Sequence, residues 1–193
     1  MRLCSIASGS SGNCIYVGSD NTHVLVDIGI SGKKMETGLN SLELTGRDLD
    51  GILITHEHSD HIKGLGVISR KYGIPIYATA GTVDAMVRTN ALGKIPEGIF
   101  HEIQEDEPFM INDLKVNPFT IPHDAAQPVG YRLEHEGHSV GIATDLGKYN
   151  DYIIENLQGL DALLLEANHD IRMLQVLSLI HISEPTRLRR ISY

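Results

Sequence analysis

The stretch Gly51-Ile-Leu-Ile-Thr-His-Glu-His-Ser-Asp-His61 decides the fold. Its first five residues form an apolar run with the length and the β-branched content of a buried strand. The six positions that follow hold four potential metal ligands: His56, His58, Asp60 and His61. Histidines at positions i and i+2 at a strand end point to the same side, so His56 and His58 can reach one cation. Asp60 and His61, one turn further on, can face a second cation.

A solvated polar turn in a His-rich chain is the alternative interpretation of this cluster. The apolar strand before it and the segment Ile62-Lys-Gly-Leu65 after it favour a strand-to-helix turn instead, which is where ligand sites lie in α/β folds. Imidazole nitrogens and carboxylate oxygens suit divalent Zn, Mn or Fe. The cluster therefore predicts a metal site, and the sequence leaves the choice of metal open.

The pattern His-x-His-x-Asp-His after a buried strand resembles the signature of the metallo-β-lactamase superfamily of metal-dependent hydrolases. Leu25-Val-Asp-Ile-Gly29 resembles the early Asp motif of that superfamily, and His123 and Asp145 resemble its next two ligands. The resemblance implies an α/β (α+β) fold of the αββα sandwich type. Periodicity alone predicts only a mixed α/β domain.

The resemblance also implies roles for the site residues. His56, His58 and His123 would hold the first of two divalent cations, and Asp60 and His61 would face the second. Asp145 would bridge the two cations, and Asp60 and Asp145 are the expected catalytic carboxylates. Asp27 is expected to orient a ligand or the backbone of the motif rather than to bind metal, and a strand-ending turn residue is its alternative.

Softer motifs resemble a narrower bacterial group, the exonuclease-like phosphodiesterases of the YycJ/WalJ type. They are Ser8-Gly-Ser-Ser-Gly-Asn13, His123-Asp-Ala125 with Pro128-Val-Gly-Tyr131, and Glu166-Ala-Asn-His-Asp170. This resemblance implies a DNA substrate, cleaved by a metal-activated hydroxide. The alternatives are a glyoxalase-II-like thioester hydrolase and, for this chain, an inactive metal-binding fragment. The Ser8–Asn13 loop could be a substrate-phosphate contact or a plain hairpin turn, and the pattern does not decide between them.

The carboxyl end differs in character from the rest. Residues 177–187, Leu-Ser-Leu-Ile-His-Ile-Ser-Glu-Pro-Thr-Arg, match the translation of a transposase-type sequencing adapter. We therefore expect residues 1–176 to form a metallo-β-lactamase-like domain that is incomplete at its carboxyl end. Residues 177–193 are expected to be a non-native tail, which excludes His181 as a ligand. A short basic tail that touches nucleic acid is the alternative, and the last ligand histidine of the family is expected further downstream.

Composition narrows the classes of protein. The chain has 193 residues, 41% of them apolar, and a net charge of −9, which becomes −11 for residues 1–176. That balance fits one domain with a core and argues against a general polyanion-coating protein. It does not exclude a nuclease, because two cations add positive charge at the site. Five residues near the motif could form a basic rim or a solvated helix face: Lys33, Lys34, Lys63, Arg70 and Lys71.

Cysteine content and hydropathy indicate the cellular location of the protein. Cys4 and Cys14 lack ligand-like CxxC spacing and are expected to be small apolar strand residues. No signal peptide precedes Met1-Arg-Leu-Cys-Ser5, and no apolar run approaches membrane-spanning length. We therefore expect a cytoplasmic protein without a membrane partner, and its oligomeric state stays open.

Alternating strand and helix patterns run along the chain. Strands are expected at 2–7, 14–18, 23–27, 50–55, 74–78, 109–111, 114–119, 129–136, 139–143 and 162–166, and residues 99–119 and 129–143 are expected to supply the second sheet. Helices are expected at 31–44, 62–72, 81–91 and 150–157, the first with Ser31 as its cap. His135 and His138 flank a predicted hairpin turn and His101 flanks a strand, so none of them is expected to bind metal. His169 could approach the site as a substrate contact.

Overall fold

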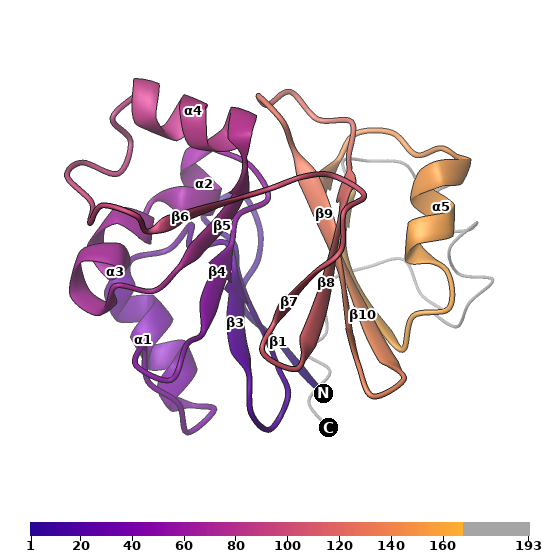
Figure 1. Ribbon diagram of the computed structural model, residues 1–193, viewed down its shortest axis with the longest axis horizontal. Helices are drawn as coiled ribbons and strands as arrows, with labels where there is room; N and C mark the ends of the chain where they lie inside the picture. The colour runs from indigo at the N-terminus through magenta and orange to yellow at the C-terminus, as the bar shows by residue number, and fades with distance from the viewer. Residues whose placement is uncertain (168–193) are drawn as a thin grey trace.

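Two β-sheets packed face to face, with helices on their outer faces, form the described part of the chain (Figure 1). The computed structural model describes residues 1–167, and the expectation for His169 therefore lies outside the described residues. The first sheet has the strand order β1-β2-β3-β4-β5-β6. Its strands span Arg2–Ala7, Cys14–Gly18, His23–Val26, Gly51–Leu53, Ile76–Thr79 and Phe100–Ile103. The two-sheet architecture confirms the predicted αββα class.

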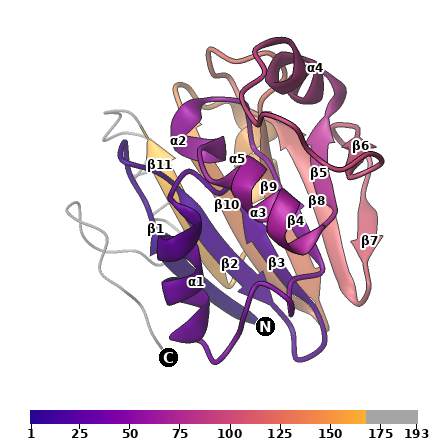
Figure 2. The same ribbon diagram turned by 90° about the vertical axis from the view of Figure 1, so that its left-hand side faces the viewer.

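The second sheet has the order β11-β10-β9-β8-β7. In chain order its strands span Phe109–Ile111, Leu114–Thr120, Val129–His135, His138–Leu146 and Ala162–Ala167. The helices α1 to α5 span Gly32–Asn40, Ser59–Ile62, Leu65–Tyr72, Ala80–Arg88 and Asp151–Leu157. The helices α1 to α4 cover the outer face of the first sheet and α5 covers the outer face of the second (Figures 1 and 2). No helix within residues 1–167 is long and apolar enough to cross a bilayer.

Period-two alternation builds the two cores on either side of the first sheet. In β2, Tyr16 packs under the helices, while Ile15 and Val17 pack between the sheets. In β3, Leu25 faces the helices, while Val24 and Val26 face the second sheet. Both faces of these strands are buried, which explains why they read as continuous apolar runs. A third core, which includes Phe119 and Ile153, lies under α5.

One strand assignment made from the sequence was wrong. Residues 99–119 were expected to lie in the second sheet, but β6 joins the first sheet and runs parallel to β5, with Ile76 opposite Phe100. The reason is the β5-α4-β6 crossover, which returns the chain to the same sheet as a parallel neighbour. Smaller differences concern helices. Helix α1 ends at Asn40 rather than 44, and the helix expected at 62–72 begins only at Leu65, as α3, after the short α2 at Ser59–Ile62.

Strands β3, β4, β5 and β6 are parallel, so their carboxyl ends lie along one edge of the first sheet. Asp27 follows β3 and the 55–61 motif follows β4. Asp27 adopts a left-handed backbone conformation, with φ of 62°, as does Asp145 near the end of β10, with φ of 55°. Aspartate tolerates this region better than most residues, but it remains uncommon and concentrates at functional sites.

Gly29 lies where three chain segments meet. A Cβ added to Gly29 would stand 1.5 Å from the backbone oxygen of Asp60, so one of the two segments would have to move. We expect Gly29→Ala to lower the free energy of unfolding by about 1–3 kcal/mol, as overpacking does. Chemical denaturation measures the change. Gly32→Ala is the matched control, because its Cβ would meet side chains and no backbone, the nearest atom being the movable end of Ile68 at 3.0 Å. Equal losses in both variants would contradict the close-packing explanation.

Candidate metal centre

The residues 55–61 leave β4 and enter α2, with their backbone held by two neighbouring segments. The carbonyl oxygen of Asp60 accepts a hydrogen bond from the backbone N–H of Asn13 at 2.7 Å, and that of His61 accepts one from Ile28 at 2.7 Å. The rings of His56 and His61 are completely buried. The motif is therefore fixed by backbone contacts as well as by its side chains.

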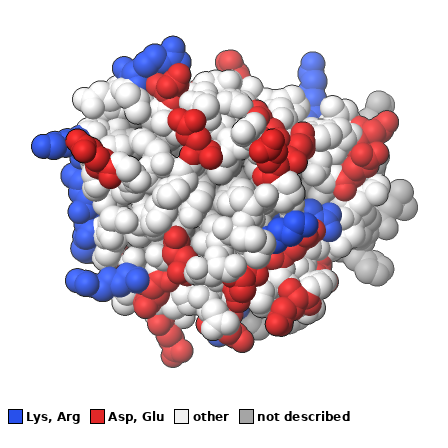
Figure 3. Space-filling view, viewed as in Figure 1, with Lys and Arg blue, Asp and Glu red and all other residues white. Residues whose placement is uncertain are grey.

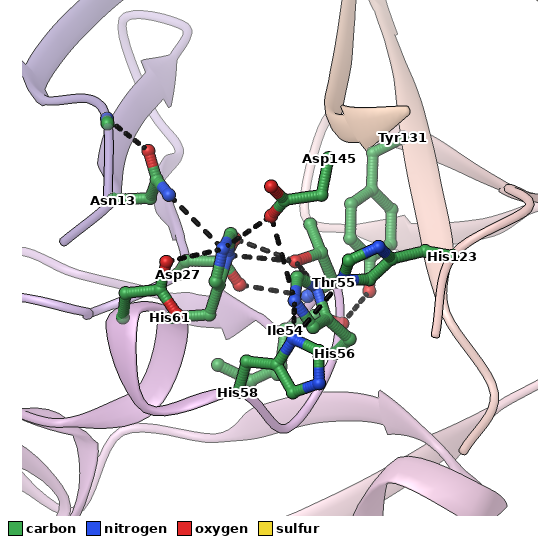
Figure 4. A network of polar contacts seen from close by, with 12 residues as sticks. Asn13, Asp27, Ile54, Thr55, His56, His58, His61, His123, Tyr131 and Asp145 are labelled. Atoms are coloured by element: carbon green, nitrogen blue, oxygen red, sulfur yellow. Dashed lines mark hydrogen bonds and ion pairs between the residues drawn. The ribbon is translucent and has the colours of Figure 1, made fainter. Parts of the chain in front are cut away.

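Three imidazole rings converge on one point. The His56 Nε2 and the His123 Nε2 each lie 3.1 Å from the His58 Nδ1. His123 comes from the loop after β8, on the opposite sheet, and its ring points at the two histidines of the first sheet (Figure 4). These three residues form one of two groups whose potential ligand atoms all lie within 4.8 Å of one another. They are the trio expected from the sequence to hold the first cation.

A second group shares one histidine with the first. The His61 Nε2 lies 2.8 Å from the Asp145 Oδ2, and the His56 Nε2 lies 3.7 Å from the same oxygen. His56, His61 and Asp145 again lie within 4.8 Å of one another. Asp145 belongs to this second group, and its Oδ2 faces both His61 and the shared His56. Asp60 lies at the edge, with its Oδ2 3.8 Å from the His61 Nε2 and its side chain 33% exposed.

Hydrogen bonds behind the rings fix which nitrogen faces the cluster. The Thr55 hydroxyl donates to the Asp27 Oδ2 at 2.8 Å, so it can only accept from the His56 Nδ1, at 3.0 Å. The His61 Nδ1–H donates to the same Asp27 oxygen at 2.8 Å. The Nε2 atoms of both rings therefore point into the cluster. Ring nitrogens that converge on one point, with hydrogen-bond partners behind them, are a donor set that fits a divalent cation.

Asp27 is fully buried and accepts a further hydrogen bond at its Oδ1 from the Thr55 backbone N–H, at 2.9 Å. It lies behind the ligand cluster and contacts His61 rather than the cluster's centre (Figure 4). This position agrees with the expectation that Asp27 orients a ligand.

The protonation of the site follows from burial and charge. Burial, with His61 and other histidines nearby, lowers the pKa of His56 to about 2, which keeps its ring in the neutral form that binds metals. Burial also lowers the pKa of His61, but the carboxylates of Asp27 and Asp145 outweigh this effect and raise it to about 10. The hydrogen bond from His61 lowers the pKa of Asp145. Without metal, a proton on His61 thus supplies the positive charge opposite Asp145.

Several residues around the site were not singled out by the sequence analysis. The Thr55 hydroxyl orients His56, and the Glu57 Oε1 accepts the backbone N–H of Ala126 at 2.8 Å, which ties the loop of His123 to the motif. Asn13 belongs to the Gly- and Ser-rich loop whose role was left open, and its Nδ2 lies 3.1 Å from the His61 Nε2. Only the loop composition gave a signal, because the contacts of Glu57 and Asn13 join segments far apart in the sequence.

The three histidines that were expected to avoid the site do so. His101 lies in β6 with its ring stacked on Tyr77, at a centroid distance of 5.1 Å. His135 and His138 flank the β9–β10 turn, where the His138 Nδ1 pairs with Asp161 at 3.4 Å.

The expected basic rim divides into two parts. Arg70 donates to the backbone oxygens of Leu92 and Lys94, and Lys71 pairs with Glu36. Both side chains therefore make contacts within the helical layer that covers the first sheet. The other three residues are exposed: Lys33, Lys34 and Lys63. In the view of Figure 3, Lys and Arg side chains gather at the left-hand edge, over α1 and α3, while acidic side chains spread across the face.

A cation that binds only the folded chain should stabilise it. At a free concentration 100 times the dissociation constant, one such site raises the free energy of unfolding by about 2.7 kcal/mol. We expect added Zn²⁺ or Mn²⁺ to raise the thermal midpoint of the chain, and a chelator to reverse the rise. Scanning calorimetry measures both. A midpoint that does not respond to either treatment would contradict a metal centre.

Comparisons with known proteins agree with the fold and show the family. A profile of the beta-lactamase superfamily domain matches residues 22–185. The chain is 41% identical over 176 residues to an exodeoxyribonuclease YycJ from Bacillus anthracis, a match that covers 91% of this chain and 66% of the relative. It is 40% identical over 170 residues to an exodeoxyribonuclease WalJ from Streptococcus pneumoniae, covering 88% of this chain and 63% of the relative. The chain thus spans less than two thirds of the length of either relative.

Solved structures with the same fold have more distant sequences. A metallo-beta-lactamase fold protein YhfI from Bacillus subtilis superposes with a TM-score of 0.66 at 18% identity, covering 83% of this chain and 68% of that one. Zinc-bound PqqB from Methylobacterium extorquens superposes with a TM-score of 0.64 at 18% identity, covering 80% and 59% of the two chains. At this identity the likeness shows the fold alone.

Proposed function

Because this chain belongs to the beta-lactamase superfamily, we propose that it is a dinuclear metal-dependent phosphodiesterase that acts on DNA as an exonuclease. One observation carries the proposal: five side chains from three separate segments meet in two overlapping groups that could each hold a divalent cation. Their orientation by Thr55 and Asp27 supports it further, because such partners are what position metal ligands. The exodeoxyribonuclease names of the two relatives support the choice of DNA as substrate.

The residues divide into two sets of ligands. His56, His58 and His123 would hold one cation, and His61 with Asp60 would hold the other. Asp145 would be shared, since its Oδ2 faces both His56 and His61. When bound, a pair of divalent cations supplies an acidified water and positive charge opposite a phosphate group. Zn, Mn and Fe all suit this donor set.

The carboxylates of Asp60 and Asp145 are the proposed catalytic groups. The lowered pKa of Asp145 keeps it ionised, so both of its oxygens are available as acceptors between the two sets of ligands. The side chain of Asp60 is one third exposed at the edge of the cluster, where a substrate can reach it. The buried His56 and His61 exclude water from the back of the cluster.

The substrate class can be tested with two substrates in parallel. The chain, loaded with Mn²⁺ or Zn²⁺, is incubated with an end-labelled single-stranded oligonucleotide and with S-lactoylglutathione. We expect release of mononucleotides that requires the cation, and no thioester hydrolysis. Thioester hydrolysis without DNA cleavage would replace the proposal with the glyoxalase-II-like alternative. Two bound cations without turnover of either substrate would favour the inactive-fragment alternative.

A further inference from the structure

Asn13 is a buried amide that reaches the metal centre from a loop outside the ligand motifs. The residue is 1% exposed, and its Oδ1 accepts the backbone N–H of Gly9 at 3.0 Å. That bond fixes the orientation of the amide, because an Nδ2 in the same position could not accept the N–H. The Nδ2 group is therefore the end that points at the His61 Nε2, 3.1 Å away (Figure 4).

The loop holds this amide in place. The backbone N–H of Asn13 donates to the Asp60 oxygen and its carbonyl accepts the N–H of Gly29, both at 2.7 Å. Gly12, beside it, has φ of +135°, and a Cβ there would stand 2.3 Å from the Gly29 oxygen. The loop thus needs glycine at position 12 to lie this close, and Asn13 cannot move away without breaking backbone hydrogen bonds.

The His61 Nε2 is not a free acceptor for the Asn13 amide. The His61 Nδ1–H is engaged by Asp27, so the Nε2 offers at most a single lone pair. That position is taken either by a proton shared with the Asp145 Oδ2, 2.8 Å away, or by a bound cation, and in both states the Asn13 Nδ2–H is a buried donor without this acceptor. A buried donor without an acceptor costs free energy. The cation-loaded site therefore favours a ligand that places an acceptor oxygen next to the Asn13 Nδ2–H.

We propose that Asn13 is a substrate-binding residue whose Nδ2–H donates to a phosphate oxygen of the bound nucleotide. This inference rests on the proposed phosphodiesterase function. The neighbouring Asp27, Asp60 and Asp145 are acceptors when ionised and would repel a phosphate, whereas a neutral amide donor attracts one. The role also accounts for the Ser8–Asn13 loop, which the metal ligands alone leave unexplained.

Binding of deoxyadenosine 5′-monophosphate to the Mn²⁺-loaded chain tests the inference without requiring turnover. Isothermal titration calorimetry gives the affinity, and elemental analysis gives the number of bound cations. We expect Asn13→Ala to weaken nucleotide binding about tenfold, as the loss of one hydrogen bond to a charged group does. Asn13→Asp keeps the size and the acceptor for Gly9 but turns the donor into a carboxylate, so it should weaken binding further. Both variants should keep the wild-type number of cations.

Asn21→Ala is the matched control, because the Asn21 side chain lies at the opposite end of the sheet, near Asp113, and should leave the affinity unchanged. Unchanged nucleotide affinity in Asn13→Ala and Asn13→Asp would overturn the substrate contact while leaving the phosphodiesterase proposal intact. If the Asn13 variants lost both their bound cations and their nucleotide affinity, the substrate contact would also be overturned, since Asn13 would then support the metal site. A wild-type chain that holds two cations but binds no nucleotide would refute the phosphodiesterase proposal and, with it, this inference.

Discussion

Replacing His58 by alanine is expected to remove one of two bound cations and to lower phosphodiesterase turnover at least about a hundredfold. The His58 Nδ1 is the atom that both other nitrogens of the first group face, at 3.1 Å each. Changes to residues that only orient a ligand commonly cost 10–100-fold in metal affinity or activity, so removal of a ligand should cost more. Asp60→Ala should also abolish turnover, because it removes a carboxylate from the side of the second cation.

Elemental analysis of the purified variants and the rate of oligonucleotide cleavage measure these effects. His135→Ala is the control, because this ring contacts the backbone oxygen of Asp113 at the far end of the second sheet. It should change neither the cation content nor the rate. Near-wild-type turnover by Asp60→Ala, after the protein has been stripped of metal and reloaded, would count against the dinuclear mechanism.

Asp27→Asn is expected to lower the free energy of unfolding by about 3 kcal/mol, since it removes the charged partner from a buried pair. The Asp27 Oδ2 accepts from both the Thr55 hydroxyl and His61, and its Oδ1 accepts from the Thr55 backbone N–H. An amide has a single acceptor oxygen, so at least one of these buried donors loses its partner. Asparagine tolerates the left-handed backbone as well as aspartate does, so the loss reports on the hydrogen bonds rather than on strain.

The same variant should weaken cation binding 10–100-fold, because His61 loses the acceptor that orients its ring. Chemical denaturation without metal and cation titration of the folded variant separate the two effects. Asp20→Asn, on an exposed turn, is the control and should change neither quantity. If Asp27→Asn matched the control in both measurements, Asp27 would have no part in orienting the centre.

The site could be predicted from the sequence where its residues are close together in the chain. The spacing of His56, His58 and His61 behind an apolar strand predicted a metal site without help from any other segment, and the structure gathers these rings in one cluster. His123 and Asp145 were different, because spacing alone does not select them among 10 histidines and 25 acidic residues. The resemblance to a family selected them, and the structure places both beside the motif.

What the sequence did not reveal depends on contacts between distant segments. The roles of Thr55 and Asn13 follow from hydrogen bonds that exist only once the loop after β1, the end of β3 and the motif are packed together. The sheet to which β6 belongs was likewise mistaken, because the four residues Phe100–Ile103, exposed only in the middle, have no alternating pattern that identifies a partner. Local pattern predicts that an element exists, whereas its neighbours are decided by packing.

Anomalous X-ray scattering from crystals of the Mn²⁺- or Zn²⁺-loaded chain tests the central claim most directly. We expect two peaks, one among the rings of His56, His58 and His123 and one beside His61, with Asp145 between them. A single peak would contradict the dinuclear centre. Full loading of the protein with no peak near His123 or Asp145 would contradict the whole functional assignment.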